Sequence, residues 1–74
     1  MSGSLPEPVW RGPDGEIIAC VEKLMVLREN LEEIQSSCQD ALDDAVLMGC
    51  EEQQFRRALA GLVARLKSEY AKAG

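Results

Sequence analysis

Apolar residues recur from Glu16 to Met48 in alternating steps of three and four positions. This spacing places them on one side of an α-helix, at the a and d positions of a heptad repeat. The segment contains no Gly or Pro, so no residue in it forces the helix to stop. The pattern therefore predicts one long helix over 16–48. Its apolar positions are Ile17, Cys20, Leu24, Leu27, Leu31, Ile34, Cys38, Ala41, Ala45 and Met48.

Two adjacent serines, Ser36 and Ser37, are the weak point of this helix. Serine is a poor helix former, and Ser37 followed by Asp40 resembles a weakened capping box that could begin another helix. A break there would turn the chain into a three-helix bundle, which is the alternative fold. Because the apolar positions keep their phase through Ile34 and Cys38, we predict an unbroken helix.

A second helix is predicted over 51–71, after a tight turn at Gly49 and Cys50. Gly49 follows the apolar pattern directly and suits the left-handed residue that often ends a helix. The acids that come next are favourable in the first turn, where the helix dipole is positive. Apolar residues in this segment again recur at helical spacing, namely Phe55, Leu59, Leu62 and Leu66.

The segment before the first helix, 1–15, holds all three prolines of the chain. Proline removes a backbone donor and disfavours a helical residue before it, so we expect a flexible or extended N-terminal arm. Within this arm, the sequence Gly-Pro-Asp-Gly at 12–15 is typical of a turn.

The fold class expected is all-α, an antiparallel hairpin of a long and a short helix, covering 16–74. In such a hairpin the second helix reaches back only to about Arg28, which leaves the very apolar segment Ile17–Leu27 uncovered. Soluble monomers rarely expose so large an apolar patch. Three covers are conceivable: the arm with Leu5, Val9 and Trp10, a second copy, or a different protein.

A second copy is the simplest cover, so we expect a homodimer in which two hairpins form a four-helix bundle with coiled-coil packing. A chain of 74 residues is also short for an independent core. The residues expected at the interaction surface share an apolar character and lie near the start of the long helix. They are Trp10, Ile17, Val21, Leu24, Met25, Leu27 and Leu31.

Charge is unevenly distributed along this acidic chain, whose net charge is −5. Segment 16–50 has eight acids and two bases, hence −6, whereas 51–74 has three acids and five bases, hence +2. The two halves are electrostatically complementary. The acidic balance argues against nucleic acid or an anionic membrane as a partner. The first ten residues do not resemble a signal peptide and no segment is long and apolar enough to span a bilayer, so we expect a cytoplasmic protein.

The three cysteines are the only reactive groups that stand out. Their odd number, the lack of a CxxC pair and the absence of histidine argue against a disulfide framework or a zinc site. Cys20 and Cys38 lie on the apolar pattern, where we expect inert thiols. Cys50 precedes a helix N-terminus, a position that favours a reactive thiolate.

No catalytic, cofactor-binding or metal-binding motif is visible in the sequence, and the acids Asp40, Asp43 and Asp44 are expected to form a solvated face. We therefore expect a non-enzymatic protein-interaction module, an adaptor, assembly factor or regulator that acts as a homodimer. One alternative is a thiol-based sensor or carrier that uses Cys50. Another is a small subunit of a larger complex, docked through Ile17–Leu27.

Overall fold

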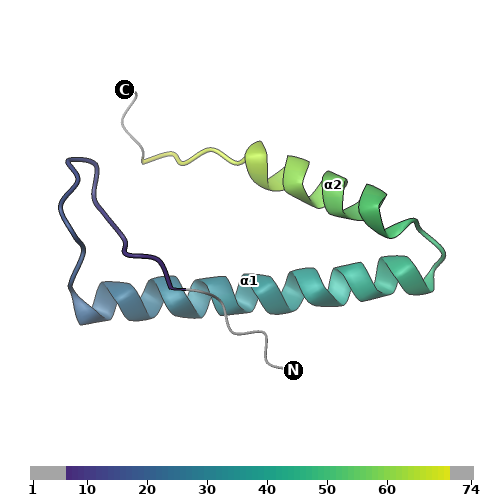
Figure 1. Cartoon of the computed structure of the whole chain (residues 1–74), viewed down its shortest axis with the longest axis horizontal. Coiled ribbons are helices and arrows are strands. Elements are labelled where there is room, and N and C mark those ends of the chain that lie inside the picture. The colour runs from purple at the N-terminus through teal and green to yellow at the C-terminus, as the bar shows by residue number, and fades with distance from the viewer. Residues whose placement is uncertain (1–6, 71–74) are drawn as a thin grey trace. The chain divides into compact units, whose positions relative to one another are not determined.

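The computed structural model describes residues 7–70 and contains two helices, α1 (Val21–Leu47) and α2 (Glu52–Ala64) (Figure 1). Within these residues the only extended pairing is an isolated antiparallel bridge between Arg11 and Ile17. The chain divides into two compact units, Met1–Gln39 and Asp40–Gly74, with the boundary inside α1. The all-helical class expected from the sequence is confirmed.

In the first unit, α1 begins at Val21 and not at Glu16, so the predicted start is wrong. Residues 16–18 are instead held by backbone hydrogen bonds to the preceding residues: the Gly12 amide donates to the Glu16 carbonyl at 2.8 Å and the Ile18 amide to the Trp10 carbonyl at 2.9 Å. The β-branched residues Ile17 and Ile18 favour extended backbone, which explains why they precede α1 and are not part of it.

The turn predicted over 12–15 is present and reverses the chain within segment 7–20, which we call the leading segment. The Gly15 amide donates to the Gly12 carbonyl at 3.0 Å, and Gly15 has a φ of +88°. The Arg11 guanidinium also donates to the Gly15 carbonyl at 3.0 Å. These bonds fold the described part of the predicted arm back on itself, while Leu5 lies outside the described residues.

Helix α1 is continuous through Ser36 and Ser37, so the alternative three-helix bundle is wrong. Its least exposed residues form a line that we call the seam. At the middle of the seam Gln35 is half-buried while Ile34 is 53% exposed, against the heptad expectation. A straight helix has 3.6 residues per turn and drifts from a strict heptad, which accounts for the change. The seam comprises Leu24, Leu27, Leu31, Gln35, Cys38, Ala41, Leu42 and Ala45.

In the second unit, Gly49 ends α1 as predicted, with a φ of +97°. The Cys50 amide donates to the Ala45 carbonyl at 2.9 Å and the Gly49 amide to the Val46 carbonyl at 3.0 Å. This pair of bonds is a Schellman motif, which satisfies carbonyls at the helix end. The predicted helix bound of Met48 lies one position beyond the observed end at Leu47.

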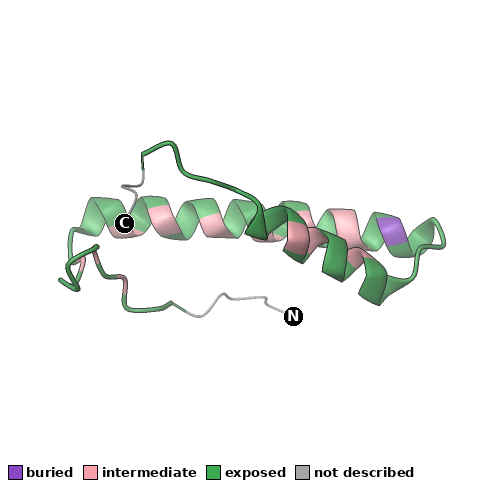
Figure 2. Cartoon of the chain, turned by 90° about the horizontal axis from the view of Figure 1, so that it is seen from above, coloured by how far each residue is buried: buried purple, intermediate pink, exposed green. Residues whose placement is uncertain are grey.

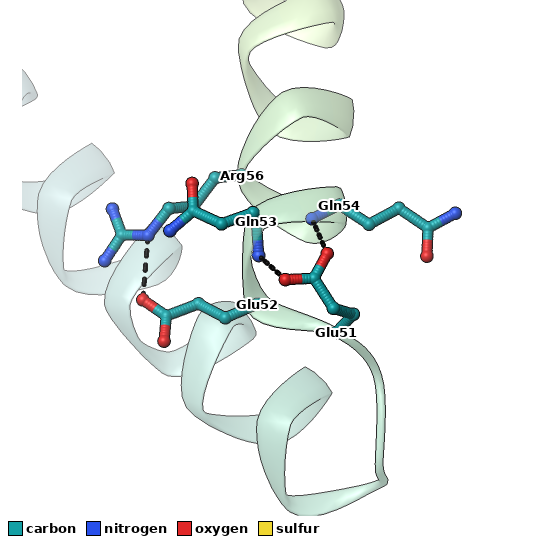
Figure 3. Close-up of polar contacts among 5 residues, drawn as sticks. All are labelled: Glu51, Glu52, Gln53, Gln54 and Arg56. Atoms are coloured by element: carbon teal, nitrogen blue, oxygen red, sulfur yellow. Dashed lines mark hydrogen bonds and ion pairs between the residues drawn. The ribbon is translucent and has the colours of Figure 1, made fainter.

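Helix α2 begins with a cap made by Glu51, whose carboxylate accepts from the Gln54 amide at 2.8 Å and from the Gln53 amide at 3.0 Å (Figure 3). Glu51 therefore precedes the helix, and the predicted start at this residue is corrected to Glu52. Within the first turns, Arg56 pairs with Glu52 at 2.9 Å. The carboxylates at this end also suit the positive end of the helix dipole.

Helix α2 ends at Ala64, well before the predicted bound of Ala71, which lies outside the described residues. The Arg65 amide donates to the Gly61 and Leu62 carbonyls at 3.2 Å, which closes the last turn. Gly61 and Val63 are poor helix formers, and Leu66 beyond the end is 71% exposed. Little burial is therefore available to extend the helix.

The last turns of α1 and helix α2 pack against each other in this unit, and both contain partly buried positions (Figure 2). On α2, Phe55 and Leu59 are half-buried. Among the described residues Ala45 alone is a buried side chain, at 3% exposure. A small residue at this point allows the two helices to approach closely. The rest of the apolar surface in residues 7–70 stays at least partly exposed to solvent.

Candidate interaction surface

An apolar groove in the first unit lies between the leading segment and the N-terminal half of α1. Its volume is about 530 Å³. Four of the residues that the sequence predicts for the interaction surface line it together, namely Trp10, Ile17, Leu24 and Leu31. The other lining residues are Glu7, Pro8, Val9, Ile18, Ala19, Arg28 and Glu32. Four of the seven residues predicted for the interaction surface thus line one surface feature.

The leading segment is fixed against α1 by an ion pair between Glu7 and Arg28, whose charged atoms approach to 2.6 Å. Further along the segment, the Ile18 amide donates a hydrogen bond to the Trp10 carbonyl and thereby fixes the backbone that carries the indole. Trp10 is half-buried, whereas Val9 beside it is 64% exposed. The segment therefore forms one wall of the groove and leaves apolar surface open to solvent.

The remaining predicted residues lie outside this groove. Val21 is 69% exposed and Met25 is 52% exposed, on the flank of the seam. Leu27 is half-buried and lines a second apolar depression of about 450 Å³ together with Ile18 and Val26. Val26 was not named singly among the expected interface residues, although it lies in the apolar segment Ile17–Leu27 that the sequence analysis described as uncovered.

The rim of the groove carries three charged side chains that sequence spacing did not single out, Glu7, Arg28 and Glu32. Arg28 is paired with Glu7, and its side chain is 57% exposed. An apolar groove with a polar rim is suited to receive apolar side chains of another peptide segment and to orient them by charge. The groove is therefore a candidate binding surface.

A second uncovered apolar surface lies in the other unit, at the C-terminal end of α2. Leu62 is 51% exposed, Val63 54% and Leu66 71%. Leu62 shares a helix face with the half-buried Phe55 and Leu59, so the apolar face of α2 continues past the part that is covered. Exposed Arg65 and Lys67 flank this surface.

Cys20 lies next to the start of α1, where its surroundings change the chemistry of its thiol. Contrary to expectation it is exposed and precedes α1, where its carbonyl accepts from the Leu24 amide at 3.0 Å. Hydrogen bonds from the backbone amides of Lys23 and Glu22, with a smaller contribution from the Lys23 charge, lower the pKa of the Cys20 thiol. The sequence reasoning missed this because it placed Cys20 inside a helix.

The other two thiols are also free. Cys38 is half-buried on the seam, in keeping with a structural role, while Cys50 is exposed at the end of the Schellman motif. The Cys50 amide belongs to that motif, in keeping with the tight turn predicted at Gly49 and Cys50. Over residues 7–70, no three cysteine, aspartate or glutamate side chains cluster closely enough to hold a metal ion.

In the described part of the chain, neither helix has the length and hydropathy needed to cross a bilayer. Comparison of the chain with protein-family models, with curated proteins and with solved structures finds no match.

Proposed function

We propose that this protein is a non-enzymatic protein-interaction module that works as a homodimer, in the manner of an adaptor, an assembly factor or a small regulator. The observation that carries the proposal is the scarcity of a core. Ala45 is the one buried side chain of the described residues, and residues 7–39 of the first unit contain none. Small domains normally gain the missing burial from disulfides, metals or association.

Association is the route that the surface chemistry favours. All three cysteines are free, and the groove and the flank of the seam present leucine, isoleucine, valine and methionine side chains to solvent. Burying apolar surface contributes about 25 cal/mol per Å², and this gain must exceed the roughly 4–15 kcal/mol that association costs, so the interface has to cover much of this surface. Val21, Val9 and Ile17, which are 59–69% exposed, have the most apolar surface left to bury.

The helix lengths support a partner built from helices. Helix α1 has 27 residues and α2 has 13, which correspond to about 40 Å and about 20 Å at 1.5 Å per residue. The length of one α2 therefore matches about half of α1. Two copies of the chain supply two of each helix, enough for a four-helix bundle in which both halves of the seam have a neighbour.

The direct test is the molar mass of the full chain by light scattering at tens of micromolar. A mass of twice 8.1 kDa, falling towards 8.1 kDa on dilution, is expected. A mass that stays at 8.1 kDa across this range contradicts the homodimer and favours a different protein as the partner of the groove.

A further inference from the structure

We propose that the apolar surface on the N-terminal half of α1 is covered by α2 of a second copy of the chain, with Arg65 and Lys67 of that copy beside Glu29 and Glu32. This inference rests on the proposed homodimer and specifies how its two chains contact each other. It assigns a partner to each of the two uncovered surfaces, the one at Val21–Leu31 and the one at Leu62–Leu66.

Charge complementarity is the first argument. Positions 29–44 carry six acids and no base, whereas positions 53–68 carry four bases and no acid. Glu32, which lines the groove, and Glu29, one turn before it on α1, are exposed, as are Arg65 and Lys67. Arg28, the base next to these acids, is already paired with Glu7. Opposite potentials on two apolar surfaces favour their encounter and fix their relative orientation.

Matching apolar surfaces are the second argument. The end of α2 offers Leu62 and Val63, and Leu66 follows just beyond it; these residues are 51–71% exposed. The half-buried leucines of the seam and the exposed Val21 and Met25 offer a stripe of similar character on α1. Both surfaces have apolar residues in the middle and charged residues at the edge, which is the usual anatomy of a protein interface.

Symmetry is the third argument. In a dimer with a two-fold axis and antiparallel α1 helices, the N-terminal half of each α1 lies beside the C-terminal half of the other, and hence beside the α2 that packs there. Each contact then occurs twice, once in each direction. Both copies bury their uncovered stripe, and no apolar end is left to recruit further chains.

The test exchanges the charges between chains. One variant carries Arg65→Glu and Lys67→Glu, and the other carries Glu29→Lys and Glu32→Lys. Each variant alone places like charges together at both contacts, so its dimer dissociation constant is expected to rise roughly tenfold or more. When the two variants are mixed, both contacts pair opposite charges, and a heterodimer as tight as the unaltered dimer is expected.

The mixing step separates contacts between chains from contacts within a chain. If the same charges met inside one chain, mixing would restore nothing, which would overturn the inference. A chain that carries all four reversals is the control, and it must dimerise like the unaltered protein. Retained helix content by circular dichroism confirms that each variant is folded.

A second measurement uses the unaltered chain and so does not depend on the variants. Equal amounts of ¹⁴N and ¹⁵N chains are mixed and coupled with a zero-length carbodiimide reagent. Coupling of Lys67 from one isotope to Glu29 or Glu32 from the other is expected. Coupling only within one isotope, from a sample that is dimeric by light scattering, overturns the inference and leaves the homodimer standing. A monomeric mass overturns both.

Discussion

The carboxylate of Glu7 and the guanidinium of Arg28 approach to 2.6 Å and connect the leading segment to α1. Both side chains are more than half exposed, so the pair contributes only about 0–1 kcal/mol to stability. Its importance is in position, because it lies at the rim of the groove that Trp10 helps to form.

Removing this ion pair is expected to move the indole without unfolding the protein. Trp10 is the single tryptophan, so its fluorescence reports on the groove alone. Glu7→Gln should shift the emission to longer wavelength, with little change in the midpoint of urea unfolding. Raising the ionic strength should reproduce the shift in the unaltered chain, since exposed pairs are screened. Glu69→Gln removes the same charge from the other unit, and an equal shift there would contradict the assignment.

Leu24→Asp tests the apolar face of α1 directly. Leu24 is half-buried on the seam and lines the groove, so a charge there opposes any partner that covers it. We expect the variant to be monomeric by light scattering at concentrations where the unaltered chain is dimeric, with most of its helix content retained. Asn30→Asp adds the same charge at an exposed position of α1 and should leave the mass unchanged. Equal masses for all three chains would contradict the interface.

Two glycines are expected to respond to alanine in opposite directions. Gly49 has a φ of +97°, where a Cβ is strained, so Gly49→Ala should lower the free energy of unfolding by about 1 kcal/mol. Gly61 is inside α2, and a Cβ there would lie 3.4 Å from the flexible end of Arg65. Gly61→Ala should therefore raise the free energy of unfolding by about 0.5–1 kcal/mol. Urea denaturation measures both, and a shift of the same sign in the two variants would rule out this account.

Cys20 is predicted to be the fastest of the three thiols to react. It is exposed, and amides of Glu22 and Lys23 at the start of α1 favour its thiolate, which is the nucleophile. Alkylation at neutral pH should show a fast phase that Cys20→Ser removes and Cys50→Ser leaves. Because folding lowers the Cys20 pKa, this group stabilises the folded state increasingly as pH rises through the folded pKa, and the contribution is lost as pH falls. A fast phase that survives Cys20→Ser would contradict the assignment.

The hydrophobic spacing of the sequence was enough to predict two helices and the turn between them. Gly49 was identified from its place after the last apolar position, and its positive φ confirms the reason. The helix bounds were less accurate. Ile17 and Ile18 continue the apolar pattern but belong to extended backbone, since pairing with Trp10 and Arg11 competes with the helix. Periodicity contains no information about that competition.

The groove was predictable in part. Leu24, Leu31, Ile17 and Trp10 were named from their apolar character, but their common neighbours Glu7 and Arg28 were not. The distance between those two positions in the sequence hides a contact that only the reversal at 12–15 creates. Cys20 was also misjudged. Its thiol chemistry depends on where α1 starts, and the hydrophobic spacing placed that start at Glu16.

The Schellman turn at Gly49 also has a consequence for how the chain folds. The turn joins two helices that follow each other directly in sequence, so the contacts of the second unit form between residues of small sequence separation. Helical proteins with such low contact order fold in microseconds to milliseconds. A dimer must in addition wait for two chains to meet, which at low concentration takes much longer. The helices would then form early, and the slow, concentration-dependent step would be encounter.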